Sequence, residues 1–332
     1  MSLESSENSF DRAGISVVIP VYRSEKVLPI LIGRLESVLR KTASNFELVL
    51  VNDCSPDRSW EVISDLAARH SWIHAIDLMR NFGQHNALLC GIRAAQFDTI
   101  VTMDDDLQHP PEEIPKLLDI LTRLDCDVAY GTPERVQHGL MRNLATLVTK
   151  LALRTVIDAK VVRDVSAFRA FRSQVATAFG NYEAPFVSID VLLTWGTSRF
   201  GSVRVRHEPR QEGASGYTLR KLASHTMNLV TGFSALPLRI ASLMGLLFSL
   251  LGLGVLCYVL GRFLLLGDTV PGFPFLASIV AIFSGAQLFA IGIIGEYLAR
   301  MHFRSLQMPP YVIRAITGAH RVRNNPIEPS SR

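Results

Sequence analysis

The 332-residue sequence has few cysteines and no segment that resembles a secretory leader. Its four cysteines, Cys54, Cys90, Cys126 and Cys257, lack metal-ligand spacing, so no role is assigned to them. Residues 1–14 are polar and acidic, without a basic start and an apolar run, and we expect them to be disordered rather than a signal peptide. No nucleic-acid-binding motif accompanies the net charge of +4, so we expect no nucleic-acid partner.

Charged residues are absent from two long stretches near the C-terminus, residues 240–261 and 269–295. Each stretch exceeds the roughly 20 apolar residues that cross a hydrocarbon core. We therefore predict transmembrane helices over residues 239–266 and 274–299. The alternative is a pair of buried helices in a soluble protein, but charge-free runs of this length are rare in soluble folds.

Lysine and arginine are concentrated on one side of the two predicted spans. Seven precede the first span (Arg199, Arg204, Arg206, Arg210, Arg220, Lys221 and Arg239), three follow the second (Arg300, Arg304 and Arg314), and only Arg262 lies near the connection. We expect a multi-pass protein of the inner (plasma) membrane, and the positive-inside rule predicts that both termini and residues 15–217 are cytoplasmic, with residues 300–332 as a cytoplasmic tail. Residues 218–238 are predicted to form an amphipathic helix, either in the membrane interface or packed on the domain surface.

Residues 15–217 alternate between β-branched runs and helical patterns. The predicted strands cover residues 15–20, 46–51, 73–78 and 99–103, and the predicted helices cover residues 25–41, 59–69 and 86–96. In the first helix, Leu28, Leu31, Leu35 and Leu39 share one face. This alternation predicts an α/β domain with a mainly parallel sheet covered by helices.

Polar residues follow the predicted strands, where ligands bind in open sheets of this class. Asp104, Asp105 and Asp106 follow an apolar strand, and three adjacent carboxylates repel one another unless a cation compensates them. Their hard oxygens suit Mg²⁺ or Mn²⁺, with substrate phosphates completing the coordination. A solvated acidic turn before a helix is the alternative. Asp53 is placed to accept hydrogen bonds from a base or ribose.

Together these segments resemble the family 2 glycosyltransferases of GT-A (Rossmann-like) fold. The resemblance rests on PVYRSE from Pro20, VNDCSPD from Val51 and MDDDLQHPPE from Met103, the last corresponding to the metal-binding DxD segment. RNFGQHNA from Arg80 and FRAFR from Phe168 narrow it to the polyisoprenyl-phosphate glycosyltransferases. That group includes dolichol-phosphate mannose synthase, the GtrB-like enzymes and, particularly similar through the GQH segment, undecaprenyl-phosphate aminoarabinose transferase.

The resemblance implies a role for each matching residue. It implies metal ligation by Asp104, Asp106 and Gln108; nucleotide contacts from Pro20, Tyr22, Glu25, Asp53, Asn81, Gln84, Asp104 and Asp105; phosphate or acceptor contacts from Arg135, Arg169, Arg210 and Ser215; and catalytic roles for Asp104, Asp106, Asp164 and Arg169. Asp164 either orients Arg169 or acts as a base. Sugar specificity is expected between Gly131 and Asn143 and from Phe186 to Asp190.

The implied reaction is an inverting transfer of a sugar from a nucleotide-sugar donor to a polyisoprenyl phosphate at the cytoplasmic membrane face. UDP is the nucleotide that the resemblance favours, with GDP and dTDP as alternatives, and relatives suggest a homo-oligomer. Two departures stand out: Asn52 replaces the commoner aspartate, and residues 213–217 lack the lysine of GxSKY. A processive polysaccharide synthase is disfavoured by the absence of QxxRW, and a non-catalytic scaffold by the intact aspartates and arginines.

Overall fold

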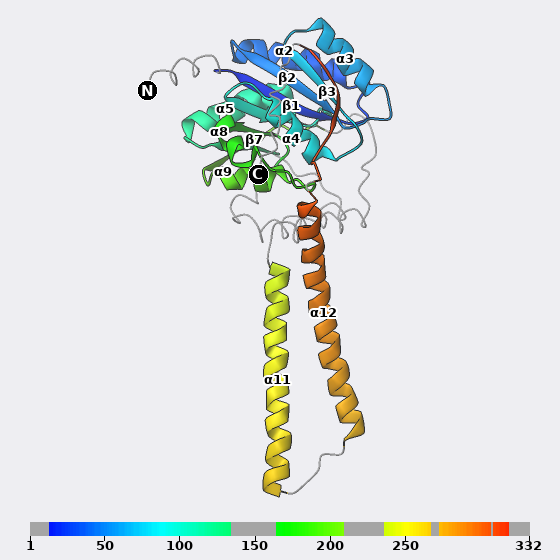
Figure 1. Ribbon diagram of the computed structural model, residues 1–332. Coiled ribbons are helices and arrows are strands. Elements are labelled where there is room, and N and C mark those ends of the chain that lie inside the picture. Colours follow the sequence, from blue (N-terminus) through cyan, green and yellow to red (C-terminus); the bar gives the residue numbers. More distant parts are fainter. Residues whose placement is uncertain (1–12, 134–163, 209–235, 267–271, 307, 319–332) are drawn as a thin grey trace, which may run out of the picture. The chain divides into compact units, whose positions relative to one another are not determined.

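The computed structural model describes residues 13–133, 164–208, 236–266, 272–306 and 308–318. The chain forms two compact units, one made of residues 1–146, 157–217 and 308–332, and the other of residues 147–156 and 218–307 (Figure 1). The described elements of the first unit are, in order, β1 (Ile15–Val21), α2 (Leu28–Thr42), β2 (Phe46–Asn52), α3 (Ser59–Arg69), β3 (Ile73–Leu78), α4 (Gln84–Ala94), β4 (Thr99–Thr102), η1 (Pro111–Glu113), α5 (Ile114–Arg123), β5 (Val128–Pro133), β6 (Arg169–Arg172), α8 (Ser173–Ala176), η2 (Thr177–Phe179), α9 (Ile189–Gly196), β7 (Phe200–Val205) and β8 (Ile313–Thr317).

One sheet runs through this unit in the order β7-β5-β6-β4-β1-β2-β3-β8. Strands β1 to β5 and β7 share a direction, while β6 and β8 run antiparallel to their neighbours. The predicted α/β class with a mainly parallel sheet is confirmed. Because β1, β2 and β3 pair in parallel register, with Val21 opposite Asn52 and Asn52 opposite Asp77, their carboxyl ends meet at one edge.

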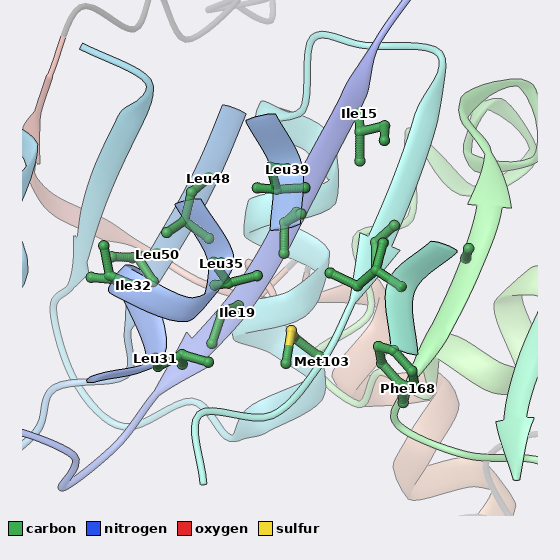
Figure 2. Packing of buried hydrophobic residues seen from close by; sticks show 14 of the residues in the cluster. Ile15, Ile19, Leu31, Ile32, Leu35, Leu39, Leu48, Leu50, Met103 and Phe168 are labelled. Carbon is green, nitrogen blue, oxygen red and sulfur yellow. The ribbon is translucent and has the colours of Figure 1, made fainter. Parts of the chain in front are cut away.

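The core forms where α2 covers β1 and β2 (Figure 2). The predicted apolar face of α2 is confirmed, since Leu28, Leu31, Leu35 and Leu39 are all fully buried. Each buried leucine contributes roughly 1.5–3 kcal/mol relative to an exposed one. This packing fixes the strands whose carboxyl ends carry the polar residues.

The second unit contains two long helices, α11 (Leu236–Leu266) and α12 (Phe273–Ser305). They lie side by side (Figure 1), and the rings of Phe248 and Phe283 contact each other at 5.8 Å between centroids. Both helices contain a segment long and apolar enough to cross a membrane, Pro237–Tyr258 and Ile282–Ala299. Their leucines face outward, and Leu265 is 84% exposed.

The C-terminal region differs from the tail predicted from residue 300. Helix α12 continues to Ser305, since neither glycine nor proline interrupts the sequence there. The chain then adds β8 to the sheet, antiparallel to β3. The alternation of Ile313, Ala315 and Thr317 with more exposed residues suits an edge strand. Residues 1–12 of the predicted N-terminal segment 1–14, and residues 218–235 of the predicted amphipathic helix 218–238, lie outside the described residues.

Candidate active site

The carboxyl edge of the sheet is built from sharp turns. Arg23, Cys54 and Leu107, which follow β1, β2 and β4, have positive φ angles of 58°, 52° and 59°. For residues with a side chain this left-handed conformation costs about 1–2 kcal/mol each. Such strain persists where the surrounding structure enforces it, and it clusters at functional sites.

Asp105, the middle carboxylate of the triplet, ties β4 to the β1 loop. Its Oδ2 accepts a hydrogen bond from the Tyr22 N–H at 3.1 Å and another from the Ser24 hydroxyl at 2.5 Å. Burial raises the pKa of Asp105 to about 6, although the bonds from Ser24 and Tyr22 act in the opposite direction. The structure therefore gives Asp105 a contact that shapes the loop, and Asp104 and Asp106 remain the better candidates for ligand binding.

Asp104 and Asp106 are half-buried and held by polar neighbours. The Gln84 side-chain amide donates to Asp104 Oδ1 at 2.5 Å, and the Gln108 N–H donates to Asp106 Oδ1 at 3.1 Å. Within the described residues, no group of three or more histidine, cysteine or acidic side chains could hold a metal by itself. Two carboxylates with partial solvent access fit the pattern of Mg²⁺ or Mn²⁺ sites that substrate phosphates complete.

Asp53 anchors the loop that follows β3. Its Oδ1 and Oδ2 accept the N–H groups of Phe82 and Gly83 at 2.7 and 2.9 Å, and the side chain is almost fully buried. Burial raises the pKa of Asp53, and these two hydrogen bonds oppose the shift. Gly83 has a φ of 94°, which suits glycine, and opens α4. Asp53 thus holds the loop that carries the exposed Asn81. Its contacts with the backbone of this loop are additional to the predicted contact with the nucleotide.

A hollow of about 170 Å³ lies between the loop after β1, the loop after β2 and the acidic residues 104–106. Its lining consists of Arg23, Ser24, Glu25, Lys26, Val27, Asp57 and Asp106. Glu25 is fixed there by accepting the Arg58 N–H at 2.9 Å and by donating its own N–H to Asp57 at 3.3 Å. Two other residues predicted to contact the nucleotide lie in different environments. Pro20 is buried within β1, whereas Tyr22 is 43% exposed beside the hollow.

Arg169 lies beneath the site instead of facing solvent. The side chain is 1% exposed, forms an ion pair with Asp190, and donates from Nε to Thr102 Oγ1 at 2.9 Å. Burial acts to lower the pKa of Arg169, but the charge of Asp190 and then the Tyr130 hydroxyl outweigh it and the pKa is raised. The direct phosphate contact expected of Arg169 stays a prediction, and in this structure the guanidinium is buried and paired with Asp190. Its position next to β4 suits a positioning role.

Asp164 is not the partner of Arg169. Its Oδ2 accepts a hydrogen bond from the Ser202 hydroxyl of β7 at 2.9 Å. Asp190, which fell only within the predicted sugar-pocket range, takes the position beside Arg169 and also accepts the Tyr130 hydroxyl at 3.2 Å. No local sequence signal links these residues, because they come from β5, β6 and α9. The predicted residues Arg135, Arg210 and Ser215 lie outside the described residues.

The contacts of Asn52 account for the asparagine at a position where the family more commonly has aspartate. Its amide donates to Asp77 Oδ1 at 2.7 Å, and both side chains are buried. An aspartate at position 52 would place two carboxylates against each other, which raises the free energy of the folded state. Asn52 therefore complements Asp77, a buried partner that the local motif does not reveal.

The buried His109 makes the stability of this region depend on pH. Its ring stacks on Phe168 and lies 5.1 Å from the ring of His207. Burial, and secondarily His207, lowers the pKa of His109 to about 4. Between the ordinary histidine pKa of about 6.5 and this value, the unfolded chain binds a proton that the folded chain does not, so stability falls on acidification by up to about 3 kcal/mol.

Urea unfolding followed by tryptophan fluorescence measures this loss, because Trp60, Trp72 and Trp195 all belong to the first unit. Carboxylates also titrate in this range, so the informative quantity is the difference between the wild type and His109→Phe. We expect the free energy of unfolding to fall less steeply from pH 7 to pH 4 in the variant. Parallel curves would show that His109 does not contribute.

Comparisons with known proteins show which family the chain resembles. Residues 16–176 match the family model described as glycosyl transferase family 2. The chain is 32% identical over 312 residues to an undecaprenyl-phosphate 4-deoxy-4-formamido-L-arabinose transferase of Pectobacterium carotovorum, covering 93% of this chain and 95% of that protein. The protein of the same description from Yersinia enterocolitica is 33% identical over 315 residues, covering 94% of this chain and 96% of the relative.

A solved structure shares the fold. Glucosyl-3-phosphoglycerate synthase from Mycobacterium tuberculosis, in complex with Mn²⁺, UDP-glucose and phosphoglyceric acid, superposes with a TM-score of 0.50 at 17% identity, covering 68% of this chain and 79% of that one. At this identity the likeness concerns the fold alone, and it agrees with the GT-A arrangement expected from the sequence.

Proposed function

The chain belongs to glycosyl transferase family 2, and from that premise we propose that it transfers a sugar from a UDP-sugar to undecaprenyl phosphate at the cytoplasmic face of the inner membrane. The observation that carries this proposal is similarity along 93% of the chain to a protein named for that acceptor. The similarity extends beyond the sheet domain to the region of the two apolar helices.

Membrane insertion of α11 and α12 fits a lipid-linked acceptor. Their apolar surfaces are exposed, with Leu265 at 84% and Leu288 at 70%, and lipid would cover them. The basic residues before α11 and after α12 support a cytoplasmic position for both termini and for the catalytic domain. That position gives the enzyme access to cytoplasmic nucleotide sugars.

On the donor side, Asp104 and Asp106 would hold Mg²⁺ or Mn²⁺. When bound, a divalent ion would neutralise the negative charge that develops on the departing diphosphate. Gln84 restricts Asp104 through its hydrogen bond, and Asp105 fixes the β1 loop beside the hollow. The chain thereby presents two carboxylates in set positions without reorganising them during reaction, the condition under which electrostatic stabilisation is most effective.

On the acceptor side, a phosphate oxygen attacks the anomeric carbon, and the bond from that carbon to the diphosphate oxygen breaks. A phosphate monoester with a second pKa near 6 is largely dianionic at neutral pH, so positioning can replace a general base. Arg135, Arg210 and Ser215 are the proposed phosphate contacts. The hydrogen bond from Ser202 favours a positioning role for Asp164. A single displacement inverts the anomeric configuration.

The test is a transfer assay with purified full-length protein, undecaprenyl phosphate and Mn²⁺ or Mg²⁺. The donor panel contains radiolabelled UDP-, GDP- and dTDP-sugars and includes UDP-4-deoxy-4-formamido-L-arabinose. Metal-dependent formation of labelled lipid with one donor would support the proposal and identify the sugar. Nucleotide binding without labelled lipid from any donor would instead favour a non-catalytic membrane scaffold.

A further inference from the structure

The segment after α12 returns to the first unit and packs beside the donor side of the site. Strand β8 pairs with β3, and the Met79 N–H donates to the Val312 carbonyl at 2.9 Å. The Asn86 side-chain amide donates to the Pro310 carbonyl at 2.5 Å. Contacts on both sides of residues 79–83 therefore come from a part of the chain more than two hundred residues away.

Arg314, on β8, makes two further contacts with β3 and the loop that follows it. Its Nη2 donates to the Met79 carbonyl at 2.7 Å, and its Nη1 donates to Asp77 Oδ2 at 3.2 Å. Asp77 is 1% exposed, and its other oxygen accepts the Asn52 amide. A buried carboxylate requires such partners, and a planar guanidinium can satisfy Asp77 while also holding the backbone of the next residues.

The loop that Arg314 holds leads directly to the predicted metal-binding carboxylate. Beyond Met79, the N–H groups of Phe82 and Gly83 bind Asp53. The next residue, Gln84, donates its side-chain amide to Asp104 Oδ1. Contacts made by Arg314, Asp53 and Gln84 thus connect β8 to Asp104 through residues 79–84, which comprise the loop after β3 and the first residue of α4.

We propose that Arg314 is a positioning residue for the donor site: by holding Asp77 and the Met79 carbonyl, it fixes residues 79–84 and through Gln84 the orientation of Asp104. This inference rests on the proposed function, because it assigns the loop to donor binding. Residues that orient metal ligands typically change metal affinity or activity 10–100-fold when replaced. We therefore expect kcat/KM for the donor to fall about 10–100-fold in Arg314→Ala, while KM for the lipid acceptor stays within about twofold.

The experiment compares Arg314→Ala and Arg314→Lys with Thr317→Ala in the full-length protein. Thr317 is a matched control because it lies on the same strand and its hydroxyl contacts Ser64 at 3.2 Å, away from the donor loop. Lysine keeps the charge but not the fork, so Arg314→Lys should fall between the wild type and alanine. The measurements are donor and acceptor kinetics, UDP binding by calorimetry with Mn²⁺, and hydrogen exchange of the backbone amides.

The expected result is faster exchange at Met79, Phe82 and Gly83 in Arg314→Ala, weaker UDP binding, and Thr317→Ala close to the wild type. Unchanged exchange and UDP binding in Arg314→Ala would overturn the inference. Faster exchange throughout the domain would also overturn it, since Arg314 would then serve general stability. Lack of sugar transfer by the wild type would count against the proposed function. The positioning role of Arg314 would still be tested, because hydrogen exchange and UDP binding of the variants are compared with those of the wild type.

Discussion

Replacing Asp106 by asparagine is expected to lower kcat/KM for sugar transfer about 10²–10³-fold, the range in which loss of one preorganised electrostatic group falls. Asp106 lines the hollow and is half-buried, so its charge is close to any diphosphate bound there. Asparagine keeps an Oδ1 that can accept the Gln108 N–H, and the turn after β4 should persist. The free energy of unfolding should therefore change by less than about 1 kcal/mol.

The measurement is the initial rate of labelled-lipid formation as Mn²⁺ is varied. Asp119→Asn is the matched control, because Asp119 is an exposed carboxylate on α5 whose described partner is Arg123. The control should retain wild-type rates, whereas Asp106→Asn should also require more Mn²⁺ for half-maximal activity. Wild-type kcat/KM and Mn²⁺ dependence in Asp106→Asn would remove this residue from the metal site.

Periodic patterns predicted the regular elements from β1 to β4 and the two long helices α11 and α12, whereas the elements from η1 to β7 were not predicted. The ranges 59–69 and 73–78 agree with α3 and β3, and the other predicted elements differ from the observed ends by a few residues. Local patterns suffice there because helices such as α2 bury one apolar face and the strands are short runs buried on both faces. Strand β8 was not predicted, because its five residues gain their stability from pairing with β3, far away in the sequence.

The candidate site shows the same difference between what local sequence patterns predict and what contacts between distant segments decide. Residues that follow strands, such as Asp104 and Glu25, could be placed from sequence because parallel strands bring their carboxyl ends together. The sequence also suggested Asp53 and Arg169, but their actual partners are backbone amides and a buried carboxylate. Contacts between distant segments decide whether a charged residue faces a ligand or supports the residues that do.

The ion pair between Arg169 and Asp190 provides the largest expected change in stability. Arg169 is 1% exposed, so Asp190→Leu would leave a buried guanidinium without its counter-charge. Breaking a buried pair by removing one partner costs about 3–5 kcal/mol, because the remaining charge is neither hydrated nor compensated. Tyr130→Phe, which removes only the hydroxyl that donates to Asp190, should cost about 1 kcal/mol.

The double variant Arg169→Met/Asp190→Leu separates charge from packing. Exchanging both partners for apolar side chains of similar volume is often neutral, so the double variant should recover most of the stability lost in Asp190→Leu. Urea unfolding followed by tryptophan fluorescence is sensitive here, since Trp195 lies on α9 together with Asp190. A double variant as unstable as Asp190→Leu would mean that packing around α9, and not the unpaired guanidinium, causes the loss. Recovery of stability without recovery of transfer would leave Arg169 with the positioning role that its place beside β4 suggests.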